Sequence, residues 1–394
     1  MADAIPIVRL LPGHVKRVRA GHPWIFSNEI VMDGAAKSLP PGSVVQIEDS
    51  NGGFVVTAMF NPHSLIAGRV LSRTKDEAID ESFLRARLAA ALRLRERLYG
   101  EPFYRLVHAE ADGLPGLVID RFGRTLVIEV GSAGMEKLTP ALLTALDAML
   151  DPRTVILRND SSVRRLEGLE LEVRVAKGET ADGPVALSEN GARFFADPLS
   201  GQKTGWFYDQ RESRARVASL AVGARVLDLY AYTGGFGVLA AMKGATEVVC
   251  VDRSQPALDL ASRAAEANGV AARCRFLRGE AFETLEQLDE SFDVVIVDPP
   301  AFVRSKKDLG AGLRGYRKLM RLAAARVVPG GFLFAASCSY HVSSEAFAAE
   351  LAHALGDARR TGRVLVQAGA GPDHPVHPQL PESAYLKSVL VALD

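Results

Sequence analysis

The sequence predicts an α/β protein in which residues 187–394 form a doubly wound parallel sheet. In this part of the chain, apolar runs of strand length alternate with helical patterns. The runs are apolar at successive positions, as expected for strands covered by helices on both faces. Residues 1–75 differ, because their short β-type runs are separated by proline and glycine turns, which predict a small β-barrel ahead of the sheet.

The barrel is expected from four β-type runs: Ile5–Leu10, Ser43–Glu48, Phe54–Phe60 and Ile66–Leu71. Basic residues gather near its start, at Arg9, Lys16, Arg17 and Arg19, followed by the aromatic stretch 22–26. Two interpretations stay open. The basic residues form an ordinary solvated face beside a core tryptophan, or they belong to a small RNA-binding barrel, since basic and aromatic side chains together suit single-stranded RNA.

Residues 76–186 are predicted to form a small α+β domain. Asp80–Leu98 and Leu138–Leu150 have helical spacing, and the arginines of the first helix are expected to face solvent. The strand-like runs are Phe103–His108, Leu117–Asp120, Leu126–Val130, Val155–Arg158 and Leu169–Val175.

The alternation that predicts the parallel sheet starts near residue 225. The expected strands are Arg225–Leu229, Glu247–Val251, Arg275–Arg278, Phe292–Val297 and Phe332–Ser337, and the expected helices are Gly237–Met242, Gln255–Asn268, Ala281–Leu288 and Tyr316–Val327. Arg363–Gln367 and Ala384–Leu393 are expected to close the sheet. In such a fold the ligand cleft lies at the carboxyl ends of the strands.

Composition excludes several classes of protein. Lys+Arg and Asp+Glu both number 47, which argues against a strongly basic protein that coats nucleic acid but allows local basic patches. No apolar run has the length of a membrane span, and Met1–Ala4 lacks the basic start of a signal peptide. Three cysteines fit a reducing compartment without a disulfide framework. We therefore expect a cytoplasmic protein.

Acidic residues at successive strand ends predict the cofactor. Asp228 precedes a glycine-containing loop, and the next strands end near Asp252 and Glu280. An ammonium would meet Asp228, ribose hydroxyls would meet Asp252, and adenine would meet Glu280 and the Ala281 N–H. The order of these residues, with Asp298 after them and no G-x-G-x-x-G motif, favours S-adenosylmethionine over a nicotinamide. The further candidate cofactor residues are Tyr230, Thr233, Gly234, Gly235, Arg253 and Ser254.

The turn Asp298-Pro299-Pro300 predicts a site for a planar base. Enzymes that methylate amines usually carry an aromatic residue directly after the second proline, whereas here Ala301 intervenes before Phe302. Cytosine C5 fits better, because it becomes nucleophilic once a thiolate adds at C6. Cys338 ends another strand and is the candidate nucleophile, with Asp298 steadying the base; the alternative for Cys338 is an inert core residue.

Two further features bear on partners. Basic residues crowd the segment 303–321 directly after the Asp-Pro-Pro turn, and Arg304, Lys306 and Lys307 are expected to contact phosphates. His374 and His377 could suggest zinc, but without nearby cysteines a rigid loop is the better interpretation, so no metal is expected.

Over essentially its whole length the chain resembles the bacterial 23S ribosomal RNA 5-methylcytosine methyltransferases. The resemblance rests on the run 201–211, the Asp228 loop, D-P-P-A-F at 298–302, Ser337-Cys338-Ser339, and the tail 373–378 with Tyr385-Leu386-Lys387. It implies a PUA barrel, a small middle domain and a class I (Rossmann-like) methyltransferase domain. It also implies that Cys338 is the nucleophile and that four residues lie near the cofactor: Lys203, Thr204, Tyr208 and Arg211. The family often has lysine where this chain has Ala301.

The sequence therefore predicts a methyltransferase that forms 5-methylcytosine in large-subunit ribosomal RNA. One alternative is a ribosomal or transfer RNA methyltransferase that acts on a purine or an exocyclic amine, with Cys338 idle. Another is a non-catalytic RNA-binding assembly factor, and a nicotinamide dehydrogenase is a distant third. The sequence leaves open the target nucleotide and the oligomeric state, with a homodimer among the options.

Overall fold

The computed structural model describes residues 5–179 and 183–394. Met1–Ala4, used above to argue against a signal peptide, and residues 180–182 of the expected middle domain lie outside the described residues. The chain divides into two compact units. The first takes in Met1–Gly183, Asp197–Trp206 and Pro372–Ser383, and the second takes in Pro184–Ala196, Phe207–Gly371 and Ala384–Asp394.

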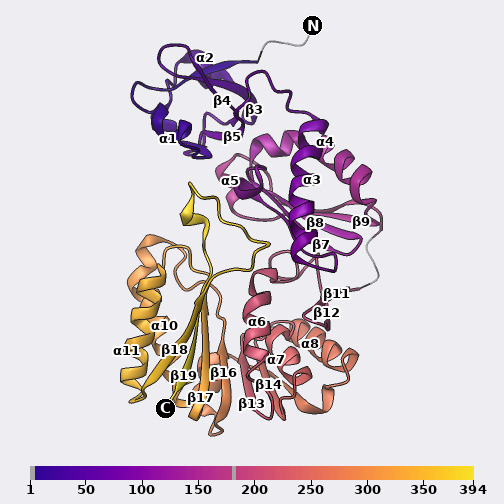
Figure 1. The fold of residues 1–394 in the computed structure, drawn as a ribbon, viewed down its shortest axis with the longest axis vertical. Coiled ribbons are helices and arrows are strands. Elements are labelled where there is room, and N and C mark those ends of the chain that lie inside the picture. The colour runs from indigo at the N-terminus through magenta and orange to yellow at the C-terminus, as the bar shows by residue number, and fades with distance from the viewer. Residues whose placement is uncertain (1–4, 180–182) are drawn as a thin grey trace. The chain divides into compact units, whose positions relative to one another are not determined.

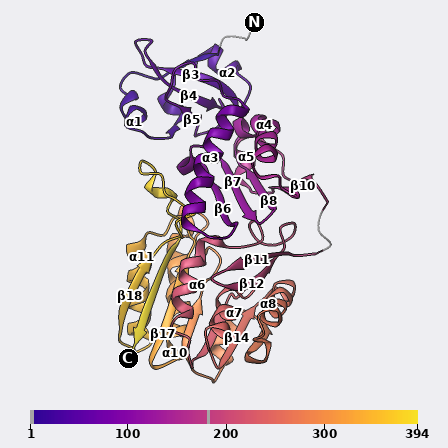
Figure 2. The ribbon, with the colours of Figure 1, turned by 45° about the vertical axis from the view of Figure 1, so that its right-hand side comes forward.

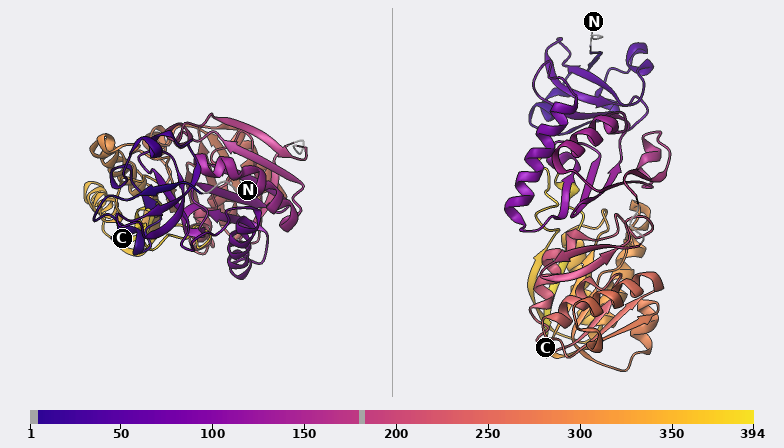
Figure 3. Two further views of the ribbon diagram at one scale, coloured as in Figure 1. Left: turned by 90° about the horizontal axis from the view of Figure 1, so that it is seen from above. Right: turned by 90° about the vertical axis from the view of Figure 1, so that its right-hand side faces the viewer.

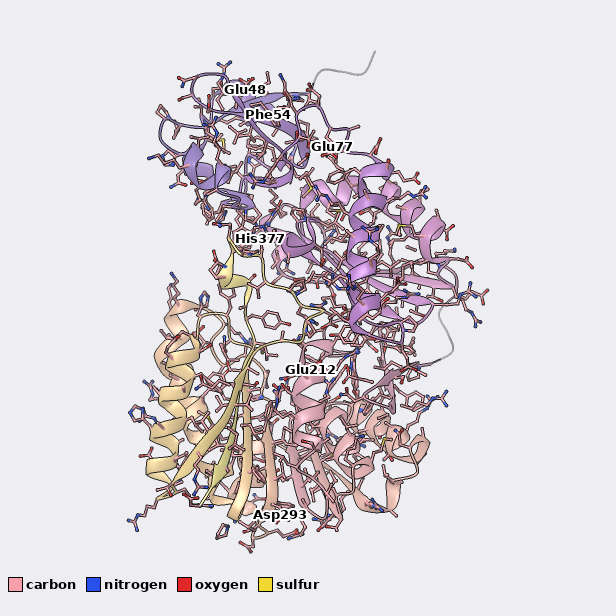
Figure 4. The ribbon with its side chains drawn as sticks, viewed as in Figure 1. Glu48, Phe54, Glu77, Glu212, Asp293 and His377 are labelled. Atoms are coloured by element: carbon pink, nitrogen blue, oxygen red, sulfur yellow. The ribbon has the colours of Figure 1, made fainter. Side chains whose placement is uncertain are left out.

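The first unit begins with a five-stranded sheet in the order β1-β3-β4-β5-β2. Its strands are β1 (Ile7–Arg9), β2 (Trp24–Ile25), β3 (Ser43–Glu48), β4 (Phe54–Phe60) and β5 (Gly68–Ser72), with the short helices α1 (Val15–Arg19) and α2 (Gly34–Ser38). Glu48 pairs with Phe54 across the β3–β4 turn (Figure 4), where Asp49 Oδ1 accepts from the Gly53 N–H. Val45, Ile47 and Val56 lie in the core of this sheet.

A second five-stranded sheet of this unit has the order β10-β9-β8-β7-β6. Its elements are α3 (Glu81–Leu98), β6 (Phe103–His108), β7 (Leu117–Phe122), β8 (Thr125–Val130), α4 (Ala133–Leu150), β9 (Thr154–Asn159), α5 (Val163–Leu166) and β10 (Glu172–Lys177). Helices α3 and α4 pack together (Figure 3). Helix α4 starts five residues before the expected Leu138, because Ser132 caps it by accepting from the Met135 N–H.

The second unit contains the predicted parallel sheet, and the predicted fold class is confirmed. Seven strands have the order β15-β14-β13-β16-β17-β19-β18. They are β13 (Arg225–Leu229), β14 (Glu247–Asp252), β15 (Cys274–Arg278), β16 (Phe292–Val297), β17 (Val327–Ser337), β18 (Gly362–Ala368) and β19 (Lys387–Leu393). The first five are parallel, whereas β19 runs antiparallel to β17 and β18. The chain thus reverses strand order between β13 and β16, which in this fold marks the ligand cleft.

Helices lie on both sides of this sheet (Figure 1). They are α6 (Arg211–Ala218), α7 (Gly235–Met242), α8 (Gln255–Ala267), α9 (Ala281–Gln287), α10 (Leu309–Ala325) and α11 (Ser344–Asp357). Helix α7 contacts α6 and α8, while α10 contacts α9 and α11. A hairpin of β11 (Val185–Glu189) and β12 (Ala192–Ala196), not expected from the sequence, packs on α8 (Figure 2).

Helix α10 corrects an expected boundary. The sequence suggested a start at Tyr316, because three glycines between 310 and 315 weaken helix propensity. The helix nevertheless starts at Leu309. A Cβ on Gly312 would lie 2.3 Å from Val303 Cγ2, so the small residue permits close packing on the Asp-Pro-Pro turn. Tertiary packing has overridden local propensity here.

Glu167 is a buried acid that joins the two sheets of the first unit. It is 4 % exposed and follows α5. Its carboxylate accepts from Asn61 Nδ2 at 3.0 Å, Ser64 Oγ at 3.1 Å and Arg69 Nη2 at 3.2 Å, and it also meets the Ala133 N–H at 3.4 Å. Because the first unit takes in both sheets, the expected boundary at residue 75 and the one at 186 stay predictions.

We expect Glu167→Ala to lower the free energy of unfolding by about 3–5 kcal/mol, the scale for breaking a buried ion pair. The variant leaves Arg69 and Asn61 without the acceptor they now share. Glu172→Ala is the control, because the Glu172–Arg174 pair is exposed and its loss should cost less than about 0.5 kcal/mol. Urea denaturation measures both, and equal losses would contradict the structural role of Glu167.

Candidate cofactor and active site

The candidate site lies at the carboxyl ends of β13, β14, β16 and β17. Asp293, labelled in Figure 4, marks the opposite, amino end of β16, where its carboxylate accepts from the Arg225 N–H at 2.8 Å. Parallel register aligns Leu229 with Val251 and with Val297. Asp252, the last residue of β14, and Asp298, which directly follows β16, therefore lie at one edge of the sheet.

Asp228 is buried at the end of β13, with 1 % of its surface exposed. Its Oδ2 accepts from the Gly237 N–H at 2.9 Å, in the first turn of α7. Gly237 has no room for a side chain, since a Cβ would lie 2.4 Å from Cys250 Sγ. Cys250 is a fully buried core residue, as expected. The loop between strand and helix is thus fixed by a carboxylate at one end and a glycine at the other.

The loop itself adopts unusual backbone angles. Tyr230, Tyr232 and Gly234 all have positive φ, at 63°, 49° and 79°. Side-chain-bearing residues adopt this region at a cost, and such strain gathers at functional sites. Thr233 is buried, and its hydroxyl has no hydrogen-bond partner within the described part of the chain. A Cβ on Gly235 would lie 2.5 Å from Arg214 Nε, so glycine is needed there for close packing.

Burial raises the pKa of Asp228 to about 7. The Gly237 N–H opposes this shift, and the negative charges of Asp298 and Asp252 add to it. A carboxylate in this environment lacks a counter-charge large enough to offset its lost hydration. A cationic ligand group would supply that charge.

Asp252 is oriented by two backbone donors. Its Oδ2 accepts from the Tyr232 N–H at 2.9 Å and its Oδ1 from the Ser254 N–H at 2.8 Å. Each carboxylate oxygen keeps a second lone pair, so both can still accept from ligand hydroxyls. Ser254 caps α8 by accepting from the Ala257 N–H, whereas Arg253 is exposed.

Glu280 and Ala281 stand at the start of α9, beyond the end of β15. Glu280 is exposed, and Ala281 is 3 % exposed as the first residue of the helix. The Ala281 N–H belongs to the first helical turn, whose amides have no partner within the helix. The Glu280 carboxylate can accept a hydrogen bond and the Ala281 N–H can donate one, so the two suit a ligand ring that offers both a donor and an acceptor.

Four residues were predicted near the cofactor by resemblance. Tyr208 is buried in the single turn η3 (Tyr208–Gln210), and the Arg211 guanidinium lies 5.5 Å from the centre of its ring. Arg211 also pairs with the buried Glu189 at 3.6 Å. Lys203 and Thr204 belong to the first unit, where the Thr204 hydroxyl donates to Asp120. Their role at the cofactor stays a prediction.

The Asp-Pro-Pro turn directly follows β16. Asp298 is half-buried, Pro299 is buried and Pro300 is exposed. Gln210 Nε2 donates to Asp298 Oδ2 at 2.9 Å, a contact that sequence reasoning missed because 88 residues separate the two. The only signal was the place of Gln210 inside the run 201–211. This donor fixes the direction of the Asp298 carboxylate.

Cys338 follows β17 and is half-buried between two fully buried serines. Ser337 Oγ donates to Tyr316 Oη at 2.9 Å, and Ser339 Oγ lies 2.8 Å from the same Tyr316 oxygen. Ser339 Oγ also accepts from the Val303 N–H at 3.1 Å, just beyond the Asp-Pro-Pro turn. The thiol and the turn are therefore held by one polar cluster. Phe302 packs against Tyr316 with tilted rings whose centres lie 4.7 Å apart.

The basic segment after the turn is only partly available for a partner. In α10, Arg317 pairs with Glu350 at 2.7 Å and Lys318 with Glu286 at 2.9 Å. Arg304, Lys306 and Lys307 are exposed, and within residues 5–179 and 183–394 none of them forms an ion pair with a carboxylate. These three, together with the exposed Arg314 of α10, remain suited to phosphate.

The basic residues of the amino-terminal sheet are mostly neutralised. Arg17 pairs with Glu29, Arg19 with Asp49 at 2.7 Å and Arg9 with Glu48 at 3.3 Å. Trp24 is half-buried, and its Nε1 donates to Glu110 at 2.8 Å. Lys16 is exposed. The solvated-face interpretation therefore accounts for more of this region than direct phosphate contact does.

The site residues fit S-adenosylmethionine. Asp228 would meet its ammonium, the oriented Asp252 its ribose hydroxyls, and Glu280 with Ala281 its adenine. The buried Thr233 hydroxyl supplies a further polar atom that awaits a partner. Across the described residues, no group of three or more His, Cys, Asp or Glu is arranged to hold a metal ion. No helix formed by these residues has the length and apolarity needed to cross a membrane.

Comparisons with known proteins agree with this geometry. Residues 158–389 match the S-adenosylmethionine-dependent methyltransferase family, and residues 8–73 match a PUA-like domain. A structure of a SAM-dependent methyltransferase from Streptococcus mutans superposes with a TM-score of 0.81 at 21 % identity, covering 98 % of this chain and 100 % of that one. One from Agrobacterium tumefaciens gives 0.51 at 16 % identity, covering 70 % and 87 %, so these two likenesses concern the fold.

Two curated relatives are called "Ribosomal RNA large subunit methyltransferase I". The one from Erwinia tasmaniensis is 40 % identical over 386 residues, which cover 96 % of this chain and 97 % of the relative. The one from Photobacterium profundum is 39 % identical over 388 residues, with the same coverage.

Fold and family together define an S-adenosylmethionine-dependent methyltransferase with a PUA-like domain. Within that class, the chain belongs to the family of ribosomal RNA large subunit methyltransferase I. The predicted cofactor and the predicted family are confirmed.

We expect Asp252→Ala to weaken S-adenosylhomocysteine binding by about 1.5–3 kcal/mol, the scale of hydrogen bonds to a charged group. Isothermal titration calorimetry measures the affinity, and a melting curve checks that the variant is folded. Asp259→Ala is the control, because Asp259 is exposed on α8 and contacts Gln255. Unchanged affinity in a folded Asp252→Ala protein would remove Asp252 from the site.

The pKa of Asp228 predicts a pH-dependent affinity. Below a pH of about 7 the carboxyl is protonated and cannot attract the ligand's ammonium, and above it the carboxylate can. Affinity for S-adenosylhomocysteine should therefore rise as the pH is raised through about 7, and then level off. Asp228→Asn should bind more weakly and lose this pH dependence. A pH-independent affinity in the unaltered protein would show that Asp228 does not face the ammonium.

Proposed function

We propose that this protein methylates carbon 5 of a cytosine in large-subunit ribosomal RNA, with Cys338 as the covalent nucleophile. The observation that carries the proposal is that Asp298 and Cys338 directly follow the carboxyl ends of the neighbouring parallel strands β16 and β17. The ribosomal substrate rests on the names of the relatives, which share the chain over almost its full length.

The chemistry explains why a thiol is needed. Cytosine C5 is a poor nucleophile, so the Cys338 thiolate adds to C6 and the electron pair of the 5,6 double bond moves to C5. S-adenosylmethionine, when bound, supplies an electrophilic methyl group. After C5 has gained its methyl, a base removes the C5 proton, that electron pair restores the double bond, and the S–C6 bond breaks to release the thiolate.

Asp298 would steady the base during addition. Negative charge spreads from C5 into the ring, and a proton held near N3 neutralises it. Gln210 keeps the Asp298 carboxylate in one direction, and the buried Pro299 fixes the backbone that follows. Pro300 and Phe302 would border the base, with Phe302 held by its ring contact with Tyr316.

Arg304, Lys306 and Lys307 would hold the RNA backbone. They are exposed directly after the turn that would carry the base, and their charges are not taken up by carboxylates of the described residues. Phosphate contacts of this kind position a nucleic acid without reading its sequence. The choice of nucleotide must then come from the shape of the RNA around the flipped base.

We expect bisulfite sequencing to find one ribosomal RNA cytosine that is methylated in cells with this gene and unmethylated in cells without it. The wild-type gene should restore the mark, while Cys338→Ala should not, because the thiolate is lost. Cys274→Ala is the matched control: burial raises the pKa of Cys274 to about 11, and it lies outside the site. The purified Cys338→Ala protein should still bind S-adenosylhomocysteine.

Trapping tests the covalent step directly. RNA containing 5-fluorocytosine should form a stable adduct with the wild-type protein, because fluorine replaces the proton that must leave before the thiolate is released. Cys338→Ala should form none. If Cys338→Ala methylates at the wild-type rate, the amine or purine alternative replaces carbon methylation. If cofactor binds but no RNA is ever methylated, the chain is an assembly factor.

A further inference from the structure

Lys387 is a buried lysine that contacts the segment carrying the candidate nucleophile. It is the first residue of β19, and antiparallel register places it opposite Ser337 of β17. Its side chain is enclosed, with 6 % of the residue exposed. Its Nζ donates to the Ser339 carbonyl oxygen at 2.7 Å. The ammonium thus contacts the residue after Cys338, while the backbone of Lys387 is paired with the residue before it.

The charge of Lys387 is not neutralised by a carboxylate. Considering residues 5–179 and 183–394, no Asp or Glu lies within ion-pair distance of its Nζ, and the Ser339 carbonyl is the acceptor it has. A buried ammonium normally requires an anionic partner or loses its proton. Burial lowers the pKa of Lys387, and Cys338 is the group that acts in the opposite direction.

We propose that Lys387 is a positioning residue for Cys338, whose ammonium, held in place by the Ser339 carbonyl, stabilises the Cys338 thiolate. The proposal rests on the proposed role of Cys338 as nucleophile and deepens it. Thiols become reactive at neutral pH when a cation adjoins them. The proton that leaves Cys338 passes to water, and the resulting pair of opposite charges replaces a lone buried cation.

Two other groups near Cys338 in the second unit are not cations. Tyr316 of α10 contacts both flanking serines, and burial raises its pKa, which keeps it neutral. Asp298 follows the neighbouring strand β16 and, as an anion, disfavours a second negative charge. His341 lies half-buried in the turn after Cys338. Lys387 is the cation that β19 brings to the segment 337–339.

The test is the pH profile of Cys338 alkylation by iodoacetamide in the full-length protein, followed at the Cys338 peptide by mass spectrometry. Three variants separate charge from structure. Lys387→Gln keeps a donor without the charge, Lys387→Met removes both, and Lys387→Arg keeps both. The pH at which the alkylation rate is half-maximal should rise by roughly one to three units in Lys387→Gln and Lys387→Met. In Lys387→Arg it should stay near the wild-type value.

A midpoint in folded Lys387→Gln equal to that of the wild type would overturn the inference, as would an equal shift in all three variants, which indicates a structural role. Melting curves identify any variant that is unfolded. Lys387→Gln is expected to remain folded, because its amide can still donate to the Ser339 carbonyl. The alkylation assay needs no RNA, so its result does not depend on whether the protein methylates cytosine. Suppose the alkylation midpoint depends on the charge at position 387 while the Cys338→Ala protein keeps full methyltransferase activity. This outcome would support the interaction of Lys387 with Cys338 and reject carbon methylation.

Discussion

The burial of the Asp228 carboxylate at the end of β13 constrains the whole cofactor edge of the sheet. A carboxylate removed from water must be offered donors or a counter-charge. The Gly237 N–H supplies one donor, which requires α7 to begin close to the strand and requires glycine where the helix meets Cys250. In the intervening loop, Tyr230 and Tyr232 adopt positive φ.

A second carboxylate stabilises this strained loop. Asp252 accepts from the Tyr232 N–H and from the Ser254 N–H, so it joins the ends of two neighbouring strands. The strain is maintained because these bonds are made inside a packed sheet. The same arrangement leaves negative charge concentrated on one edge, where Asp228, Asp252 and Asp298 influence one another. A cationic cofactor suits such an edge, and a dinucleotide with its anionic pyrophosphate does not.

The other half of the site depends on a polar cluster within an apolar core. Tyr316 connects Ser337 and Ser339, and Ser339 also meets the backbone beyond the Asp-Pro-Pro turn. A buried network of this kind is stable only when every member is satisfied, and it then fixes a single geometry. The segments that carry Asp298 and Cys338 therefore cannot move independently. This coupling matters for a reaction in which a base and a thiol must meet in one orientation.

Much of this protein was determined by local sequence. The strands β13, β14, β16 and β17 were predicted because residues buried on both faces must be apolar in succession, and the acids and the cysteine that follow them were visible as breaks in those runs. For β15 this expectation was wrong, because β15 lies at the edge of the sheet and its residues are half-buried or exposed. The barrel's basic residues were equally visible, but their pairing with Glu29, Asp49 and Glu48 was not. Local sequence reports which charges exist, whereas neutralisation depends on which chain segment lies opposite.

Tertiary structure alone decided the contacts that complete the site. Gln210 reaches Asp298 across 88 residues, and Lys387 reaches Ser339 across 48. The start of α10 also depended on close packing at Gly312, against weak local propensity, whereas the Ser132 cap of α4 is a local signal that the sequence prediction did not use. Hydrophobic periodicity describes one segment at a time, so it cannot reveal which distant residues become hydrogen-bond partners. In the seven-stranded sheet, the last strand of the chain, β19, lies between β17 and β18. This position of β19 places the buried Lys387 against the segment that carries Cys338.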